Sequence, residues 1–170
     1  MAVLQRSRLR SASNGFTLLE ILVVVAIVAV LAVVLTLAVG GNAERQLDDS
    51  AAQFRARLAH ACDEAELAGR EIGVALGGEG YAFARLDGDR WQGFGRNDEL
   101  RDRAWPTGLR VTLERDGRVL ALGGVAARVP QVVCFSSGEL TPFTLTLRLG
   151  EPALQRRLLG SADGVVSVAP

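Results

Sequence analysis

Histidine, cysteine and lysine are scarce or absent in this chain, which restricts the chemistry that it can perform. The 170 residues include one histidine, two cysteines and no lysine. The single His60 cannot form a multi-histidine metal site, and the glycine-rich stretch 77–80 lacks the lysine of a phosphate-binding loop. Ser136 and Ser137 have no histidine–acid pair to activate them. We therefore predict no catalytic residues, no cofactor and no enzymatic activity.

Neither sign of charge is in excess. Beyond Gly40, 16 arginines stand against 18 acidic residues, a formal net charge of −2. This balance lacks the basic footprint of a nucleic-acid-binding protein, so no nucleic-acid partner is expected. The acidic residues of 87–108 could form a site for an ion or a partner, but the arginines among them favour a solvated loop. Trp91 and Trp105 are expected to anchor this loop in the core, with contact to a partner as the alternative.

The two cysteines, Cys62 and Cys134, match no redox or metal-binding spacing. Both lie among apolar residues, which favours buried free thiols. A disulfide between them is the alternative, because a compartment outside the cytoplasm permits one.

Proline is absent before Pro106, and the N-terminal part of the chain contains one long apolar run. Residues 16–39 carry a single charge, Glu20, and as a helix would be roughly 36 Å long. That length spans a hydrocarbon core of about 30 Å. Arg6, Arg8 and Arg10 precede the run, so the positive-inside rule places the N-terminus in the cytoplasm.

Two ordinary interpretations of this run are a secretory signal and a simple anchor. A signal peptide has a shorter apolar region followed by a small-residue cleavage site, and neither feature is present. A simple anchor fits the length but leaves Glu20 unexplained. A charge at the centre of a membrane helix costs about 2.5–3.5 kcal/mol, so such a residue usually has a partner and a function.

The segment Gly15-Phe16-Thr17-Leu18-Leu19-Glu20 behind a basic leader resembles the N-terminus of type IV pilins and type II secretion pseudopilins. The resemblance implies cleavage of the Gly15–Phe16 bond by a prepilin peptidase, followed by N-methylation of Phe16. It also implies that Glu20 pairs with the amino terminus of a neighbouring subunit during assembly.

The remaining sequence predicts an α+β fold in which one long helix packs on antiparallel β-sheets. Apolar residues recur at spacings of three and four after residue 41, and Gly69 supplies a helix stop. The apolar stripe comprises Leu47, Ala51, Phe54, Leu58, Ala61, Cys62, Ala65 and Ala68. We expect the helix from about Thr17 to Ala68.

Beyond Gly69 the hydrophobic period changes to two, which is typical of half-buried strands. Strands are predicted around 81–84, 109–113, 132–135, 143–149, 154–159 and 165–168. Asp87-Gly88, Asp116-Gly117 and Asp163-Gly164 provide turn signals between them.

The segment 135–143, a strand followed by a Ser-Gly turn, Thr-Pro and an alternating strand, is similar to the C-terminal signature of H-type minor pseudopilins, the GspH/FimT-like group. The amphipathic helix and the strand at 81–84 also resemble that group. The chain would then be a structural subunit at the tip of the periplasmic pseudopilus, which supports export of folded proteins across the outer membrane. The alternatives are a FimT-like minor pilin of a type IV pilus, some of which act in DNA uptake, and a membrane-anchored periplasmic enzyme.

The resemblance predicts four regions. They are a cleaved leader at 1–15, a transmembrane helix half at 16–40, an amphipathic half at 41–69 and a periplasmic β-rich domain at 70–170. The protein would cross the inner membrane once, with its C-terminal domain in the periplasm. Its expected partners are the prepilin peptidase, other minor and major pseudopilins, the inner-membrane secretion platform and the membrane itself.

Overall fold

A computed structural model describes residues 17–125 and 129–169, apart from the side chains of residues 33–41. The chain divides into two compact units, residues 1–39 and residues 40–170. One helix, α1 (Leu18–Ala68), supplies the described part of the first unit and opens the second.

Helix α1 ends where the sequence predicts. Gly69 adopts a φ of 61°, a left-handed conformation that favours glycine. The amide of Gly69 donates to the Glu66 carbonyl (3.3 Å), and the amide of Arg70 donates to the Ala65 carbonyl (3.1 Å). These two bonds form a Schellman motif, which satisfies carbonyls that the helix end would otherwise leave unpaired. The chain then reverses into the first strand.

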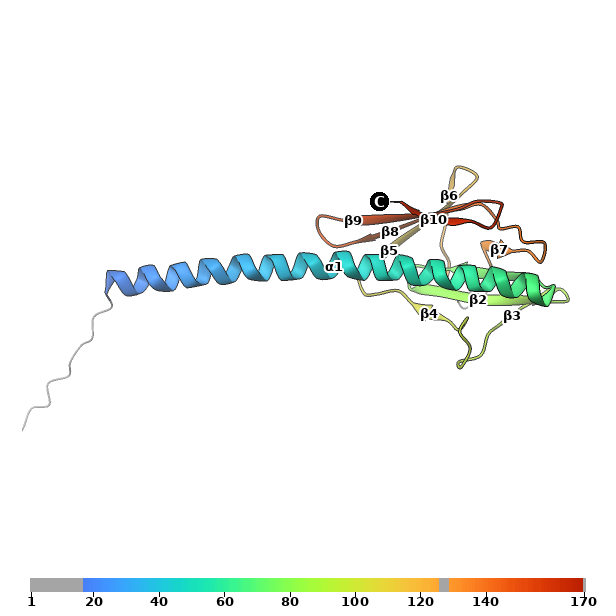
Figure 1. The fold of residues 1–170 in the computed structure, drawn as a ribbon, viewed down its shortest axis with the longest axis horizontal. Coiled ribbons are helices and arrows are strands. Elements are labelled where there is room, and N and C mark those ends of the chain that lie inside the picture. The colour runs from blue at the N-terminus through green and yellow to red at the C-terminus, as the bar shows by residue number, and fades with distance from the viewer. Residues whose placement is uncertain (1–16, 126–128, 170) are drawn as a thin grey trace, which may run out of the picture. The chain divides into compact units, whose positions relative to one another are not determined.

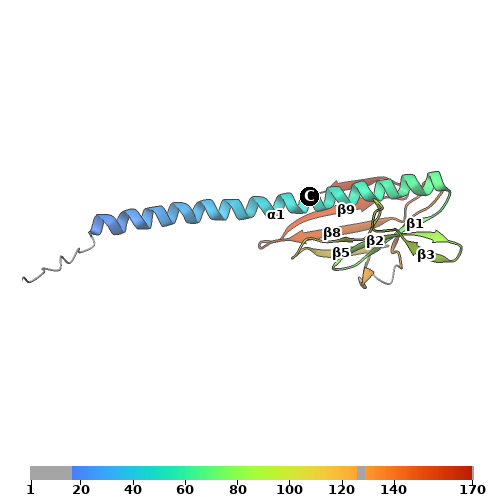
Figure 2. The same cartoon turned by 90° about the horizontal axis from the view of Figure 1, so that it is seen from below.

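In the described part of the chain, ten strands form two antiparallel sheets beside α1 (Figures 1 and 2), which confirms the predicted α+β architecture. The first sheet has the order β3-β2-β1-β7, with β4 also pairing with β2, and the second has the order β10-β9-β8-β5-β6. The first sheet contains β1 (Ile72–Leu76), β2 (Gly80–Asp87), β3 (Arg90–Gly93), β4 (Arg103–Ala104) and β7 (Val132–Cys134). The second contains β5 (Arg110–Arg115), β6 (Arg118–Leu120), β8 (Phe143–Leu149), β9 (Leu154–Gly160) and β10 (Val166–Ala169).

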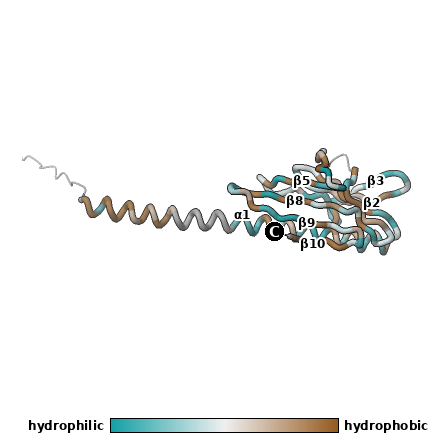
Figure 3. The backbone as a smooth tube through the Cα atoms, turned by 90° about the horizontal axis from the view of Figure 1, so that it is seen from above, coloured by the Kyte–Doolittle hydropathy of each residue, from teal (hydrophilic) through white to brown (hydrophobic). Residues whose placement is uncertain are grey.

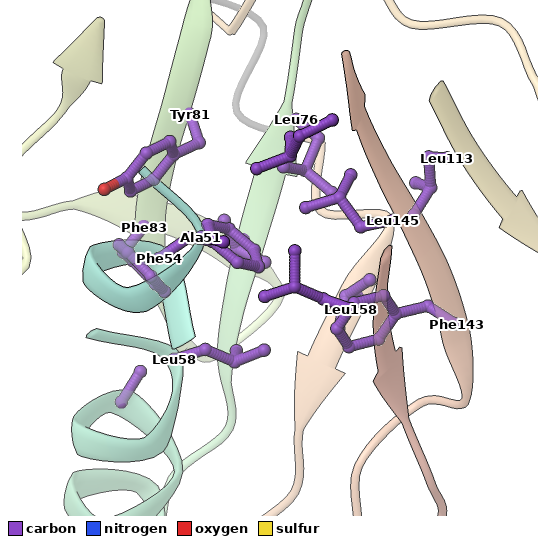
Figure 4. Packing of buried hydrophobic residues seen from close by; sticks show 14 of the residues in the cluster. Ala51, Phe54, Leu58, Leu76, Tyr81, Phe83, Leu113, Phe143, Leu145 and Leu158 are labelled. Carbon is purple, nitrogen blue, oxygen red and sulfur yellow. The ribbon is translucent and has the colours of Figure 1, made fainter. Parts of the chain in front are cut away.

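The hydrophobic core of the second unit joins the stripe of α1 to both sheets. Every predicted stripe residue is buried except Ala68, which is exposed in the last turn. Phe54 is fully buried and packs edge-on against Tyr81 of β2, with ring centroids 5.1 Å apart. Figure 4 shows Phe54 and Leu58 on the helix side of the cluster and Phe143 and Leu145 on the side of β8.

Two-residue turns set the register of two hairpins. Asp116 and Gly117 both have positive φ values, 52° and 72°, and join β5 to β6 as the Asp-Gly pair predicts. In the hairpin of β2 and β3, Asp87 pairs with Arg90 across Gly88. The segment 87–108, predicted as a loop, contains two strands, β3 and β4. These strands were not predicted, because four and two residues are too few to show a hydrophobic pattern.

Candidate functional site

The N-terminal segment of α1 is the first part of the candidate site. Gly15 and Phe16 lie outside the described residues, so the structure begins one residue after the predicted cleavage bond. The Glu20 amide donates to the Thr17 hydroxyl (3.2 Å) and to the Thr17 carbonyl (3.1 Å). Thr17 thus caps the helix. The Thr-x-x-Glu spacing is the sequence signal of such a cap, although the expected helix start rested on the apolar run alone.

Glu20 stands in the first turn of α1 with its side chain exposed. A carboxylate is favourable there, because the unpaired amides at a helix N-terminus carry partial positive charge. Among the described residues, no basic side chain pairs with it.

The helix surface around Glu20 is almost entirely apolar. Figure 3 shows the described N-terminal part of α1 mostly in the hydrophobic colour. The exposed fractions of its large apolar side chains run from 47% at Val23 to 84% at Leu18. An exposed apolar surface of this length is typical of an interaction surface. In the described part of the chain, no helix meets the combined length and hydropathy expected of a membrane span.

The second unit holds α1 to its sheets by ionic as well as apolar contacts. The Arg156 side chain on β9 lies 2.5 Å from Asp48 (Nε to Oδ1) and 3.4 Å from Glu44 (Nη2 to Oε1). The hydrogen bond that Arg156 donates to the Asp48 carboxylate raises the pKa of Arg156 above its usual value, with a smaller contribution from Glu44. Arg156 is thus a clamp between strand and helix, whereas its neighbour Arg157 is exposed.

Cys62 and Cys134 form a disulfide, so the interpretation as buried free thiols is wrong. Their Cα atoms are 4.9 Å apart, although 72 residues separate them in sequence. Both are buried, and apolar surroundings suit a disulfide as well as a thiol. The bond covalently fixes the last turns of α1 to β7 of the first sheet.

The other residues considered in the sequence differ in burial and contacts. Trp105 is buried in the core and donates its indole N–H to the Gly77 carbonyl (3.0 Å), whereas Trp91 is only half-buried. His60 is 47% exposed, and its Nε2 lies 3.5 Å from Glu99 Oε2. Ser136 and Ser137 are exposed in a turn. The described residues contain no cluster of three or more potential metal ligands.

Comparison with known families matches two regions of the chain. The family of the type II transport protein GspH matches residues 50–164, which include most of the second unit. The prokaryotic N-terminal methylation motif matches residues 10–36, which include the predicted cleavage bond and Glu20.

Named relatives and solved structures agree with this result. The chain is 35% identical to the type II secretion system protein H of Pseudomonas aeruginosa, over 90% of this chain and 92% of the relative. It is 33% identical to that of Aeromonas hydrophila, over 81% and 82%. The minor pseudopilin EpsH from the type 2 secretion system of Vibrio cholerae matches 74% of this chain and 96% of its own, with a TM-score of 0.61 and 26% identity.

The type IV minor pilin FimU of Pseudomonas aeruginosa is also similar in structure, with a TM-score of 0.52, but at 19% identity that likeness shows the fold alone. It covers 75% of this chain and 90% of the FimU chain. The family match extends over more than half of the sequence. The chain therefore belongs to the GspH family, the H-type minor pseudopilins of type II secretion systems.

Proposed function

We propose that this minor pseudopilin is made as a precursor, cut between Gly15 and Phe16, methylated on the new Phe16 amine and assembled into the periplasmic pseudopilus near its tip. Residues 16–40 anchor it in the inner membrane before assembly, with residues 1–15 cytoplasmic and the globular unit periplasmic. The observation that carries the proposal is the exposed carboxylate of Glu20 on an apolar helix surface, with no basic partner among residues 17–125 and 129–169.

Cleavage and pairing are linked by charge. Removal of residues 1–15 creates a cationic amine at Phe16, four residues before Glu20. In a bundle of apolar helices, an isolated carboxylate and an isolated ammonium group each bear a large desolvation cost, which pairing reduces. Glu20 of one subunit and the amine of its neighbour then fix the axial position of the two helices. Subunits remain in the membrane until assembly, because the apolar run is buried in lipid before it is buried in the filament.

The globular unit supplies contacts to other minor and major pseudopilins and to the inner-membrane platform, and it turns over no substrate. A rigid unit is suited to such contacts. The disulfide and the ion pairs of Arg156 fix the two sheets to the part of α1 that lies in this unit. The pseudopilus in turn supports the export of folded proteins across the outer membrane.

The test of this function is recruitment of a Glu20→Gln variant in cells that contain the other secretion components. The variant keeps the size of the side chain and removes the charge, so we expect normal insertion and cleavage but loss of co-purification with partner pseudopilins. Asp63→Leu, which removes an exposed carboxylate from α1 in the second unit, is the control and should co-purify normally. Co-purification of Glu20→Gln at the level of the unmodified protein would contradict the pairing role.

A further inference from the structure

A cavity of about 370 Å³ lies in the second unit between α1 and the segment that leads into β4. Three of its lining residues are arginines: Arg57 from the helix, Arg101 from the segment before β4 and Arg103 from β4 itself. The rest of the lining comprises Gln53, Ala56, His60 and Glu99. Three guanidinium groups from two elements far apart in sequence therefore converge on one hollow.

These guanidinium groups are incompletely paired. The Nε atoms of Arg57 and Arg103 are buried and lack a hydrogen-bond partner among the described residues. Arg57 donates one Nη1 bond to the Glu99 carbonyl (2.5 Å), and Arg101 donates to the Asp98 carbonyl at 3.5 Å. Carbonyl oxygens solvate a guanidinium group but do not neutralise it. A buried donor without a partner has a free-energy cost.

Electrostatic effects on neighbouring groups agree with this geometry. Burial lowers the pKa of Arg103, and the charges of Arg57 and Arg101 lower it further. Burial raises the pKa of the Tyr81 phenol, while Arg57 and Arg103 partly offset that rise, so both arginines lie near its hydroxyl. Figure 4 shows the Tyr81 oxygen pointing away from the other labelled core side chains. The positive charges thus repel one another beside a buried phenol.

The residues around the cavity restrict the anion to a small one. Glu99 lines the cavity with an 83% exposed side chain, and its carboxylate is 3.5 Å from His60 Nε2; Glu64 lies 4.0 Å from the same atom. A nucleic-acid backbone or an anionic lipid surface presents many negative charges and would meet these acids. A single carboxylate brings one negative charge to a lining that holds three arginines and one acid, Glu99.

We propose that this cavity binds a carboxylate group, an acidic side chain or chain terminus, of a neighbouring subunit in the pseudopilus. The proposal rests on the proposed function for the identity of the partner. Two or three guanidinium groups can bind one carboxylate with bidentate, charge-assisted hydrogen bonds, which fix orientation as well as add affinity. The cavity would then set the rotation of one globular unit against the next, while Glu20 sets the axial position of the helices.

The experiment introduces a photo-cross-linking amino acid at Ala56, which lines the cavity and is exposed, in the full chain expressed with the other secretion components. Mass spectrometry of the cross-linked product should identify a pseudopilin peptide that contains Asp, Glu or a chain terminus. Arg57→Gln combined with Arg103→Gln should reduce the cross-link at least about tenfold, because charge-assisted bonds are lost. Arg55→Gln, an exposed arginine on the same helix outside the cavity, should leave it unchanged.

Folding and function are read in the same samples. The melting temperature of the double variant is measured alongside, because the variant loses two mutually repelling charges but also the Arg57 bond to the Glu99 carbonyl. If the double variant melts lower than the unmodified chain, Arg101→Gln replaces it and should also reduce the cross-link. Normal cleavage at Gly15 and normal Glu20-dependent recruitment together with an undiminished cross-link in the variants would overturn the carboxylate site and leave the proposed function intact. Cross-linking to lipid or nucleic acid would overturn it as well.

Discussion

Replacement of Phe54 by alanine should be among the most damaging single changes in the second unit. The ring is fully buried, its centroid lies 5.1 Å from that of Tyr81 and 5.9 Å from that of Trp105, and it connects α1 to the first sheet. Removal of a buried phenylalanine side chain typically costs about 3–5 kcal/mol. Each aromatic pair adds about 0.5–1.5 kcal/mol beyond its buried area, so we expect the upper part of that range, about 4–5 kcal/mol.

The assay is thermal unfolding of the full chain in detergent micelles, followed by tryptophan fluorescence. For a unit of this size, a loss of about 4–5 kcal/mol lowers the melting temperature by about 12–20 °C. Phe135→Ala is the matched control, because Phe135 is 40% exposed and lies outside the core cluster. A melting temperature for Phe54→Ala within a few degrees of that of Phe135→Ala would refute the reasoning that Phe54 stabilises the contact between α1 and the first sheet.

Two further predictions concern the same unit. Conversion of Cys62 and Cys134 to alanine should lower the free energy of unfolding by about 4 kcal/mol, because the 72-residue loop is no longer closed in the unfolded chain; urea unfolding measures this, and an unchanged midpoint would contradict it. The pKa of Asp163 is lowered, chiefly by the Ser161 hydroxyl and then by the Val165 amide. Its stabilising contribution is therefore present above about pH 4 and lost as the pH falls through the lower pKa of the folded state. Asp163→Asn should melt below the unmodified chain at pH 6, with a difference that shrinks below pH 4, whereas a constant difference would exclude the carboxylate as the cause.

The sequence predicted the helix and the alternating strands because each element buries one face. The stripe of α1 and the strand Phe143–Leu149 repeat with periods close to those of their own geometry, and the structure places both in the core. The central strand Ile72–Leu76 was not predicted, because all five of its residues are buried and no alternation results. Its glycine is required by a close approach, since a Cβ at Gly73 would collide with the ring of Pro130.

One part of the candidate site could be predicted from the sequence and another part could not. Glu20 could be recognised because one charge in an apolar run is conspicuous in the sequence. The arginine cavity could not, since Arg57 lies among other charges on the polar face of α1 and Arg101 and Arg103 lie in a segment whose acids and arginines balance. That segment is brought to the helix by the fold, through the pairing of β4 with β2 and the hydrogen bond from Arg57 to the Glu99 carbonyl. The disulfide likewise depends on the fold, which brings together two cysteines 72 residues apart.

The N-terminus of the mature protein tests the central claim most directly. After expression of the full chain with an active prepilin peptidase, intact-mass and N-terminal peptide analysis should show a protein that lacks residues 1–15 and begins at Phe16 with a methylated amine. Gly15→Val should stay uncut, because a branched side chain crowds the peptidase site, whereas the matched control Ala12→Val should be cut normally. An intact or differently placed N-terminus in the presence of active peptidase would contradict the account.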